Sequence, residues 1–309
     1  MIILVTGGTG LVGYALRQIS TNYNYELKFL SSKDCNLENL NDTKILFDYI
    51  KPDYVIHLAA CVGGLFKNMN NKVEMLEKNF KINYNVIKCC HDFKVKKCIS
   101  CLSTCIFPDD TSYPIDETMI HNGAPHNSNY TYAYAKRFLE IHSRAYREQY
   151  NDDFVCIIPT NIYGPNDNFN LDDSHVIPGL IHNCYLSKKE NKDFIVKGTG
   201  KPLRQFIYSI DLAKLIMWTL ENYSSSESLI LSVSEEDEIS ISQIAEIIAD
   251  KFDYKHRIKY DAIYSDGQYK KTANNSKLIS LVDFNFTKIK NGINDTIDWF
   301  LDKHDIIRK

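Results

Sequence analysis

The sequence predicts an α/β fold: a doubly wound parallel sheet with a smaller, interleaved α/β domain in the C-terminal part. Three observations lead to this prediction. Short apolar runs alternate with amphipathic stretches over the first half of the 309 residues, which is typical of parallel strands joined by crossover helices. A glycine-rich turn directly follows the first apolar run. After about Pro165 the alternation becomes irregular, which indicates a second unit.

The elements are assigned in order along the chain. In the first half, apolar and β-branched runs predict strands at 2–6, 26–31, 54–59, 97–103 and 154–158. Helical periodicity between them predicts helices through about Thr21, at 43–51 and 72–91, and around Tyr132 as far as Tyr150. In the second half it predicts helices at 176–187, 211–223, 240–251 and 288–303, with one strand at 229–233. We therefore expect a first domain at 1–165, with a returning segment around 205–233, and a second domain mainly at 166–309.

The composition narrows the range of functions. The formal net charge of −3 gives no reason to expect nucleic acid as a partner. No apolar run approaches the ~18–20 residues of a membrane span, and Met1 leads directly into a short apolar strand. We therefore expect no membrane partner and a cytoplasmic location.

The cysteines agree with the expected cytoplasmic location. Nine cysteines at irregular spacing favour thiols in a reducing compartment over a disulfide framework. Cys98 and Cys101 form one CxxC pair without a second. We therefore predict no metal site.

The first turn has the pattern of a dinucleotide site. The stretch Gly7-Gly8-Thr9-Gly10-Leu11-Val12-Gly13 follows a predicted strand and opens a predicted helix. Glycines there let the backbone approach a pyrophosphate at the positive end of a helix. The second strand ends in Ser31-Ser32-Lys33 instead of the acid typical of NAD sites. Two hydroxyls and a cation favour the 2′-phosphate of NADP(H), with Asp34 near the adenine; the alternative is a solvated loop with a chance lysine.

Four side chains predict carbonyl chemistry. Ser103 and Cys105 stand at the end of the strand predicted at 97–103, two residues apart, so we expect them to face the same side. Tyr132 and Lys136 lie one helical turn apart. The ammonium is expected to lower the pKa of the phenol, so that the phenol exchanges a proton with a carbonyl near neutral pH. Cys105 adds an acid/base group that a simple carbonyl reduction does not require.

With these motifs the chain resembles the extended short-chain dehydrogenases/reductases, and among them the GDP-L-fucose synthase family. The glycines and the Tyr-x-x-x-Lys pair mark only the superfamily. The stretches Leu102–Pro108 and His175–Leu180 mark the narrower family, and the resemblance runs nearly from end to end.

The resemblance implies an activity and the residues that perform it. The reaction would be NADPH-dependent 3,5-epimerisation and 4-reduction of GDP-4-keto-6-deoxy-D-mannose to GDP-L-fucose, in a homodimer. Ser103, Tyr132 and Lys136 would be the reductase triad, and Cys105 with His175 the acid/base pair of the epimerisation.

The expected binding residues fall into two sets. Those for the cofactor lie mostly at strand ends and are Gly7, Gly8, Thr9, Gly10, Leu11, Val12, Gly13, Ser31, Ser32, Lys33, Asp34, Leu58, Ala59, Ala60, Cys101, Leu102, Ser103, Thr104, Tyr132, Lys136, Pro159, Thr160, Asn161, Ile162 and His175. Those for the GDP-sugar are Asn161, Asn183, Lys197, Arg204 and Lys271. Asn183 and Lys197 stand where bacterial members of the family carry arginine and tryptophan.

Two other functions share part of this residue pattern. A sugar-nucleotide dehydratase or simple 4-epimerase of the same superfamily is one alternative. A dehydratase would want an acid pair where this chain has Ser103-Thr104-Cys105. A non-catalytic NADP-binding regulator is the other, and loss of Tyr132 or Lys136 would favour it; both are present.

Overall fold

The computed structural model describes residues 1–264, 266, 269–305 and 307, and it divides into two compact units. The first comprises Met1–Thr111, Asp116–Pro159 and Ile210–Leu231, and the second Ser112–Ile115, Thr160–Ser209 and Ser232–Lys309. The chain passes from the first unit to the second between Pro159 and Thr160, whereas the sequence predicted this boundary at 165. It returns to the first unit at 210–231, whereas the sequence predicted a returning segment around 205–233. The roles assigned to the two domains remain predictions.

The first unit is built on a six-stranded parallel sheet in the order β10-β5-β4-β3-β1-β2. Its strands are β1 (Ile2–Thr6), β2 (Glu26–Leu30), β3 (Tyr54–His57), β4 (Lys97–Cys101), β5 (Phe154–Pro159) and β10 (Leu229–Leu231). This confirms the predicted α/β, Rossmann-like class. The strand order reverses between β1 and β3, and ligands of open α/β sheets bind outside the carboxyl ends of the strands at this switch point.

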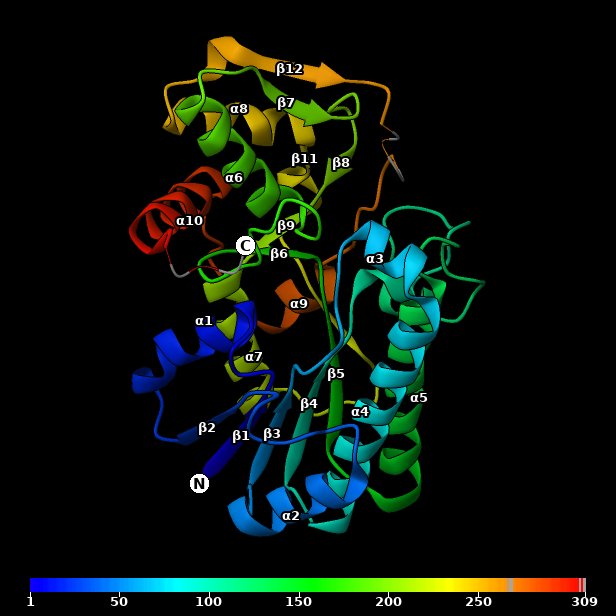
Figure 1. The fold of residues 1–309 in the computed structure, drawn as a ribbon. Coiled ribbons are helices and arrows are strands. Elements are labelled where there is room, and N and C mark those ends of the chain that lie inside the picture. Colours follow the sequence, from blue (N-terminus) through cyan, green and yellow to red (C-terminus); the bar gives the residue numbers. More distant parts are fainter. Residues whose placement is uncertain (265, 267–268, 306, 308–309) are drawn as a thin grey trace. The chain divides into compact units, whose positions relative to one another are not determined.

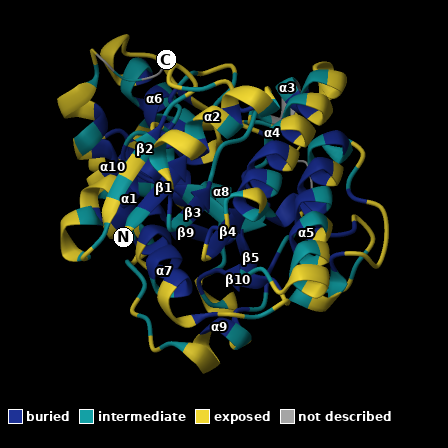
Figure 2. Cartoon of the chain, turned by 90° about the horizontal axis from the view of Figure 1, so that it is seen from below, coloured by how far each residue is buried: buried dark blue, intermediate teal, exposed yellow. Residues whose placement is uncertain are grey.

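Helices cover both faces of this sheet. They are α1 (Leu11–Ile19), α2 (Leu40–Ile50), α3 (Leu65–Asn70), α4 (Lys72–Asp92), α5 (Tyr130–Tyr150) and α7 (Ser209–Asn222). α4 and α5 pack against each other on one face, while α1 and α7 lie on the other (Figure 1). Every residue of β4 and β5 is buried, as expected for central strands covered on both faces (Figure 2).

Over its described residues, the second unit holds three two-stranded sheets and four α-helices. β6 (Asn161–Tyr163) pairs with β9 (Phe206–Tyr208), β7 (Phe194–Lys197) with β12 (Ile258–Asp261), and β8 (Leu203–Arg204) with β11 (Ile239–Ser240). The helices are α6 (Val176–Lys189), α8 (Ile241–Lys251), α9 (Ser276–Leu281) and α10 (Ile289–Lys303). The predicted helices are confirmed, but the sequence analysis missed these strands of two to four residues.

Several predicted strands end earlier than expected, and among them are two that carry predicted site residues at their ends. The strand predicted at 54–59 ends at His57, and the strand predicted at 97–103 ends at Cys101. After Cys101 the chain enters a single 3-10 turn, Thr104–Ile106. The prediction that Ser103 and Cys105 face the same side rested on strand geometry, and that basis is wrong, because Ser103 follows the strand and Cys105 lies within the turn.

A buried histidine joins the strands at the switch point. The Nδ1 atom of His57 lies 2.8 Å from the Thr6 hydroxyl, and its Nε2 lies 3.1 Å from Oδ1 of Asn83. The Asn83 amide nitrogen donates to the Ala135 carbonyl, so its oxygen accepts from Nε2–H of His57. Nδ1 then accepts from Thr6, and the ring is neutral. Burial and the Lys136 charge lower the pKa of His57 to about 3.

This histidine makes stability depend on pH. Its pKa is near 6.5 in an unfolded chain and about 3 in the folded one, so the unfolded state binds more protons between these values. The free energy of unfolding should therefore fall as the pH drops from 6.5 towards 3, with a contribution on the order of a few kcal/mol from this group. His57→Gln should reduce the slope of stability against pH in urea titrations over that window.

The matched control is His256→Gln, which removes an exposed histidine. It should keep the parent slope. An unaltered slope in His57→Gln would show that this ring does not titrate on unfolding.

Candidate active site

The glycine turn that follows β1 contacts the chain just beyond the end of β3. Gly7 has φ of 71°, and a Cβ there would stand 2.8 Å from the Ala59 backbone nitrogen. A Cβ on Gly13 would stand 2.6 Å from the Gly8 backbone. Only glycine fits this packing, and α1 begins directly after Gly10 without a side-chain cap. These features form a cradle with free helix N–H groups, which fits a dinucleotide pyrophosphate.

A small turn follows β2, where the predicted 2′-phosphate residues lie. The Asp34 carboxylate accepts from the Ser31 backbone N–H at 2.7 Å and from the Ser31 hydroxyl at 2.6 Å. These hydrogen bonds lower the pKa of Asp34. Ser32 and Lys33 are exposed at the tip. Asp34 therefore shapes the turn that carries the predicted phosphate-binding cation.

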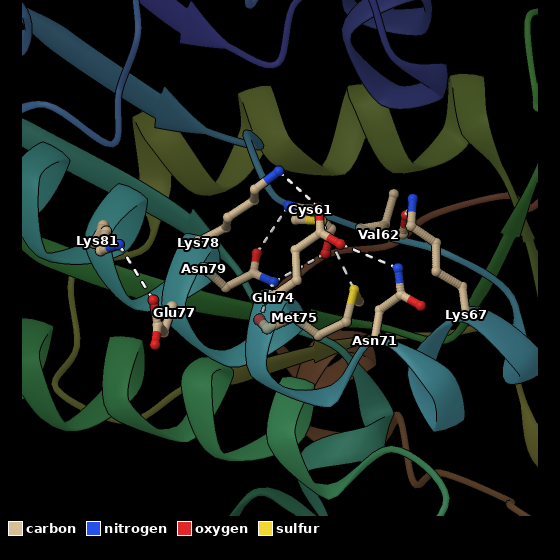
Figure 3. A network of polar contacts seen from close by, with 10 residues as sticks. All are labelled: Cys61, Val62, Lys67, Asn71, Glu74, Met75, Glu77, Lys78, Asn79 and Lys81. Atoms are coloured by element: carbon tan, nitrogen blue, oxygen red, sulfur yellow. Dashed lines mark hydrogen bonds and ion pairs between the residues drawn. The ribbon is translucent and has the colours of Figure 1, made fainter.

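The loop after β3 is held by a residue that the sequence analysis missed. The Asn79 amide accepts from the Cys61 N–H at 2.9 Å and donates to the Cys61 carbonyl at 2.9 Å (Figure 3). Asn79 thus bonds both backbone groups of Cys61, as a neighbouring strand would, and this fixes the loop that contains Ala59 and Ala60. A lone asparagine in an amphipathic helix gives no signal of this role.

The end of β4 brings together the predicted acid/base groups of the first unit. Ser103 is extended and accepts from the Cys105 N–H at 3.4 Å. Lys136 is only 2% exposed and donates to the Cys101 carbonyl at 2.7 Å. Cys105 is buried and interacts electrostatically with both Tyr132 and Lys136. The structure therefore gathers a hydroxyl, a thiol, a phenol and an ammonium around one strand end.

The ionisation of Tyr132 differs from the prediction. Burial raises the pKa of Tyr132 well above its usual range, and Cys105, Cys101 and Cys61 add to the effect. Burial also lowers the pKa of Lys136. The Lys136 Nζ atom lies 5.8 Å from the centre of the Tyr132 ring and gives its hydrogen bond to Cys101. The expected lowering of the Tyr132 pKa by Lys136 is therefore wrong, and Tyr132 is a neutral phenol that holds its proton.

The predicted residues from Thr160 onwards belong to the second unit, whereas Pro159 ends a segment of the first. His175 is exposed and directly precedes α6. The Asn161 amide donates to the Gln205 carbonyl at 2.8 Å. Gln205 is fully buried, and its amide bonds the backbone of Val233, Ser234 and Ala273, so it ties the residue that follows Arg204 to two segments remote in sequence. The sequence analysis missed this role.

The predicted phosphate-binding cations of this unit differ in their surroundings. Arg204 donates through Nη1 to the Leu203 and Tyr269 carbonyls and interacts with Glu238. Glu238 also accepts from the Thr272 hydroxyl, next to the half-buried Lys271. Lys197 is exposed, with its Nζ 5.2 Å from the centre of the Tyr264 ring. The Asn183 amide donates to the Ile195 carbonyl at 2.8 Å and so spans α6 and β7.

Comparison with known proteins assigns the family. The NAD dependent epimerase/dehydratase family matches residues 3–233. A GDP-L-fucose synthase of Dictyostelium discoideum is 55% identical and aligns with 99% of this chain and 97% of its own length. The chain belongs to the GDP-L-fucose synthase branch of that family. A probable GDP-L-fucose synthase of Drosophila melanogaster is 49% identical, with 99% of each chain covered.

A solved structure has the same fold throughout. The crystal structure of a GDP-L-fucose synthetase from Naegleria fowleri bound to NADP superimposes with a TM-score of 0.96 at 48% identity. The match covers 100% of this chain and 95% of that one. Within the residues that the structure describes, no cluster of three or more His, Cys, Asp or Glu side chains has the arrangement of a metal site.

The turn after β2 generates a prediction about the cofactor. Lys33→Asp places a negative charge where the 2′-phosphate is expected. The ratio of kcat/KM for NADPH to that for NADH should fall by roughly tenfold or more, since a charge-assisted hydrogen bond is replaced by repulsion. Steady-state kinetics with both cofactors measures the ratio.

Lys28→Ala is the matched control, since Lys28 lies within β2, before the turn, and pairs with Glu26. It should leave the ratio at the parent value. Equal efficiency with both cofactors in the parent protein would exclude the assigned role of Lys33.

Proposed function

We propose that the protein converts GDP-4-keto-6-deoxy-D-mannose to GDP-L-fucose, by 3,5-epimerisation followed by NADPH-dependent 4-reduction. The observation that carries the proposal is the buried thiol of Cys105 beside the neutral phenol of a Tyr-x-x-x-Lys pair. A reductase requires the phenol, and the thiol supplies the second acid/base group that an epimerase requires. Membership of the GDP-L-fucose synthase branch agrees with both.

The epimerisation uses the acidity of carbons beside a ketone. Both C3 and C5 flank the C4 carbonyl, so removal of either proton gives an enolate. We assign removal to Cys105 and return from the opposite face to His175. The enolate oxygen accepts hydrogen bonds from Tyr132 and Ser103, in the manner of an oxyanion hole. One set of donors therefore stabilises the intermediate of both inversions.

The reduction uses the same donors. Tyr132 holds its proton, because burial keeps its pKa high. It therefore gives a proton to the C4 oxygen as negative charge develops there. Lys136 keeps the helix and the end of β4 in register through its bond to Cys101. Bound NADPH supplies the hydride.

Each unit has its own binding role in this proposal. The cradle of Gly7 and Gly13, the turn at Lys33 and the loop at Ala59 hold the dinucleotide. Arg204 and Lys271 hold the diphosphate of the GDP-sugar, with Asn161, Asn183 and Lys197 as further contacts. Glu238 keeps the Arg204 guanidinium oriented by charge.

The direct test is the reaction itself. The protein is mixed with GDP-4-keto-6-deoxy-D-mannose and NADPH, and the loss of NADPH absorbance and the product NMR spectrum are followed. Consumption of NADPH with formation of GDP-L-fucose supports the proposal. No NADPH consumption, or a product that keeps the D-manno configuration at C3 and C5, contradicts it.

Cys105→Ser should separate the two half-reactions. A hydroxyl is a far weaker acid than a thiol, so the base is lost while the reductase groups remain. Exchange of the C3 and C5 protons with deuterated water should fall by ~10²–10⁴-fold. Slow reduction of the unepimerised ketone should continue, and NMR of the product should show the D-manno or D-talo configuration.

Tyr132→Phe is the reciprocal variant, since it keeps the ring and removes the proton donor. Reduction should then fall more than deuterium exchange. Normal labelling and normal GDP-L-fucose from Cys105→Ser would show that the thiol has only a structural role.

We also propose a homodimer formed through α4 and α5. Apolar side chains at helical spacing remain exposed on this helix pair: Val73, Leu76, Phe80, Tyr84, Tyr134 and Ile141. Phe80 is 43% exposed and stacks on Phe138, with ring centres 4.2 Å apart. Exposed apolar side chains at helical spacing on two packed helices are typical of a face that another protein surface covers. A second copy of the same face matches its chemistry.

Phe80→Glu should shift the protein from dimer to monomer, because burial of an unpaired carboxylate is unfavourable. Light scattering after gel filtration measures the mass. Ile45→Glu, at an exposed residue on α2 outside this helix pair, is the control and should keep the dimer mass. A parent protein that is monomeric at all concentrations would contradict the proposal.

For the compartment we propose the cytoplasm. All nine cysteines are described, and none forms a disulfide, which suits a reducing environment. None of the helices in the described ranges combines the length and apolar character of a membrane span.

A further inference from the structure

An arginine next to the triad lysine is buried against the turn that carries Cys105. Arg137 is only 6% exposed. Its Nε donates to the Ile106 carbonyl at 2.6 Å and its Nη1 to the Gly123 carbonyl at 2.7 Å. Nη2 is buried and has no hydrogen-bond partner among the described residues. Burial of a guanidinium against two carbonyls and no carboxylate is unfavourable for stability alone.

The two carbonyls belong to the segments that hold Cys105 in place. Ile106 is the last residue of the 3-10 turn Thr104–Ile106. The segment containing Gly123 pairs with the exit of that turn, where the Asp109 N–H donates to the Ala124 carbonyl at 3.0 Å. Arg137 therefore joins both segments to α5. Loss of these bonds would free the turn to move.

The guanidinium also sets the electrostatics of the turn. Cys105 interacts electrostatically with Arg137, and from the same helix with Tyr132 and Lys136. Lys136 gives its hydrogen bond to Cys101, whereas Arg137 bonds the residue that follows Cys105. A neighbouring cation favours the thiolate over the thiol. Arginine keeps its charge when buried, more firmly than lysine.

We propose that Arg137 is a positioning residue for proton abstraction: its guanidinium holds the Cys105 turn and stabilises the thiolate by charge. The proposal rests on the epimerase role of Cys105. In this proposal Arg137 promotes ionisation of the Cys105 thiol, and Lys136 aligns Tyr132. The Nη2 atom of Arg137 bonds neither the Ile106 nor the Gly123 carbonyl.

Two substitutions separate the charge of Arg137 from its hydrogen bonds. Arg137→Gln keeps amide donors and removes the charge, while Arg137→Lys keeps the charge and loses the fork. Alkylation of Cys105 by iodoacetamide is followed across pH by peptide mass spectrometry, and solvent deuterium exchange of the substrate is measured in parallel. In Arg137→Gln the alkylation profile should move to higher pH, and exchange at neutral pH should fall by roughly tenfold.

Arg137→Lys should keep the parent pH profile of alkylation, with slower exchange. Arg144→Gln removes an arginine from the same helix that pairs with Glu140, and it should match the parent in both measurements. Thermal melting establishes which variants are folded. If Arg137→Gln does not fold, Arg137→Lys alone is used for the test. Slower deuterium exchange of the substrate, with an unshifted pH profile of Cys105 alkylation, supports the proposal. Deuterium exchange at the parent rate overturns it.

An alkylation profile that is the same in parent and Arg137→Gln would overturn the proposal, since a merely structural arginine leaves the thiol's ionisation alone. Equal shifts in the Gln and Lys variants would overturn it too. Failure of the proposed function has a different signature. The parent protein would then show no deuterium exchange, while the alkylation profiles would still report on Arg137.

Discussion

The close approach of the glycine turn to the end of β3 is the constraint on which the rest of the first unit depends. Gly7 leaves no room for a side chain against Ala59, and the bond between Thr6 and His57 holds the two strands just before this contact. Asn83 carries the connection on to α5. The carboxyl ends of the strands thereby share one edge, where the cradle, the β2 turn and the acid/base groups lie.

Burial determines the chemistry at this edge more than pairwise charge does. Tyr132, Lys136 and His57 all have pKa values shifted towards their neutral forms. The expectation that Lys136 lowers the Tyr132 pKa considered only the Coulomb attraction. Desolvation opposes it, and Lys136 donates a hydrogen bond to the Cys101 carbonyl. The result is a phenol that donates a proton, which suits both the enolate and the alkoxide.

Local sequence patterns were sufficient for the strands and the longer helices of the first unit, but not for the short helix α3. Runs such as Phe154–Pro159 and the glycine turn have strong periodic or positional signals, and each maps to the element predicted. The strands of the second unit lie below the length at which alternation can be recognised. The turn Thr104–Ile106 was missed because Ile106 and Phe107 continue an apolar pattern.

In the candidate site, too, some residues have a local sequence signal and others have none. Groups in short motifs that we propose as catalytic, such as Tyr132 and Lys136, could be found from spacing alone. The supporting residues could not, since Asn79, Gln205 and Arg137 act on backbone groups that are remote in sequence. Their roles depend on which carbonyls and N–H groups the fold leaves unpaired, and no local pattern encodes that.

The central claim is that one set of groups at the end of β4 serves both epimerisation and reduction. The measurement that tests it most directly is the full reaction in deuterated water with unlabelled NADPH, with the product analysed by NMR. The account predicts GDP-L-fucose with deuterium on C3 and C5 and protium on C4. Protium at C3 and C5 in a product of L-galacto configuration would contradict it, because no base would then have exchanged those protons with solvent.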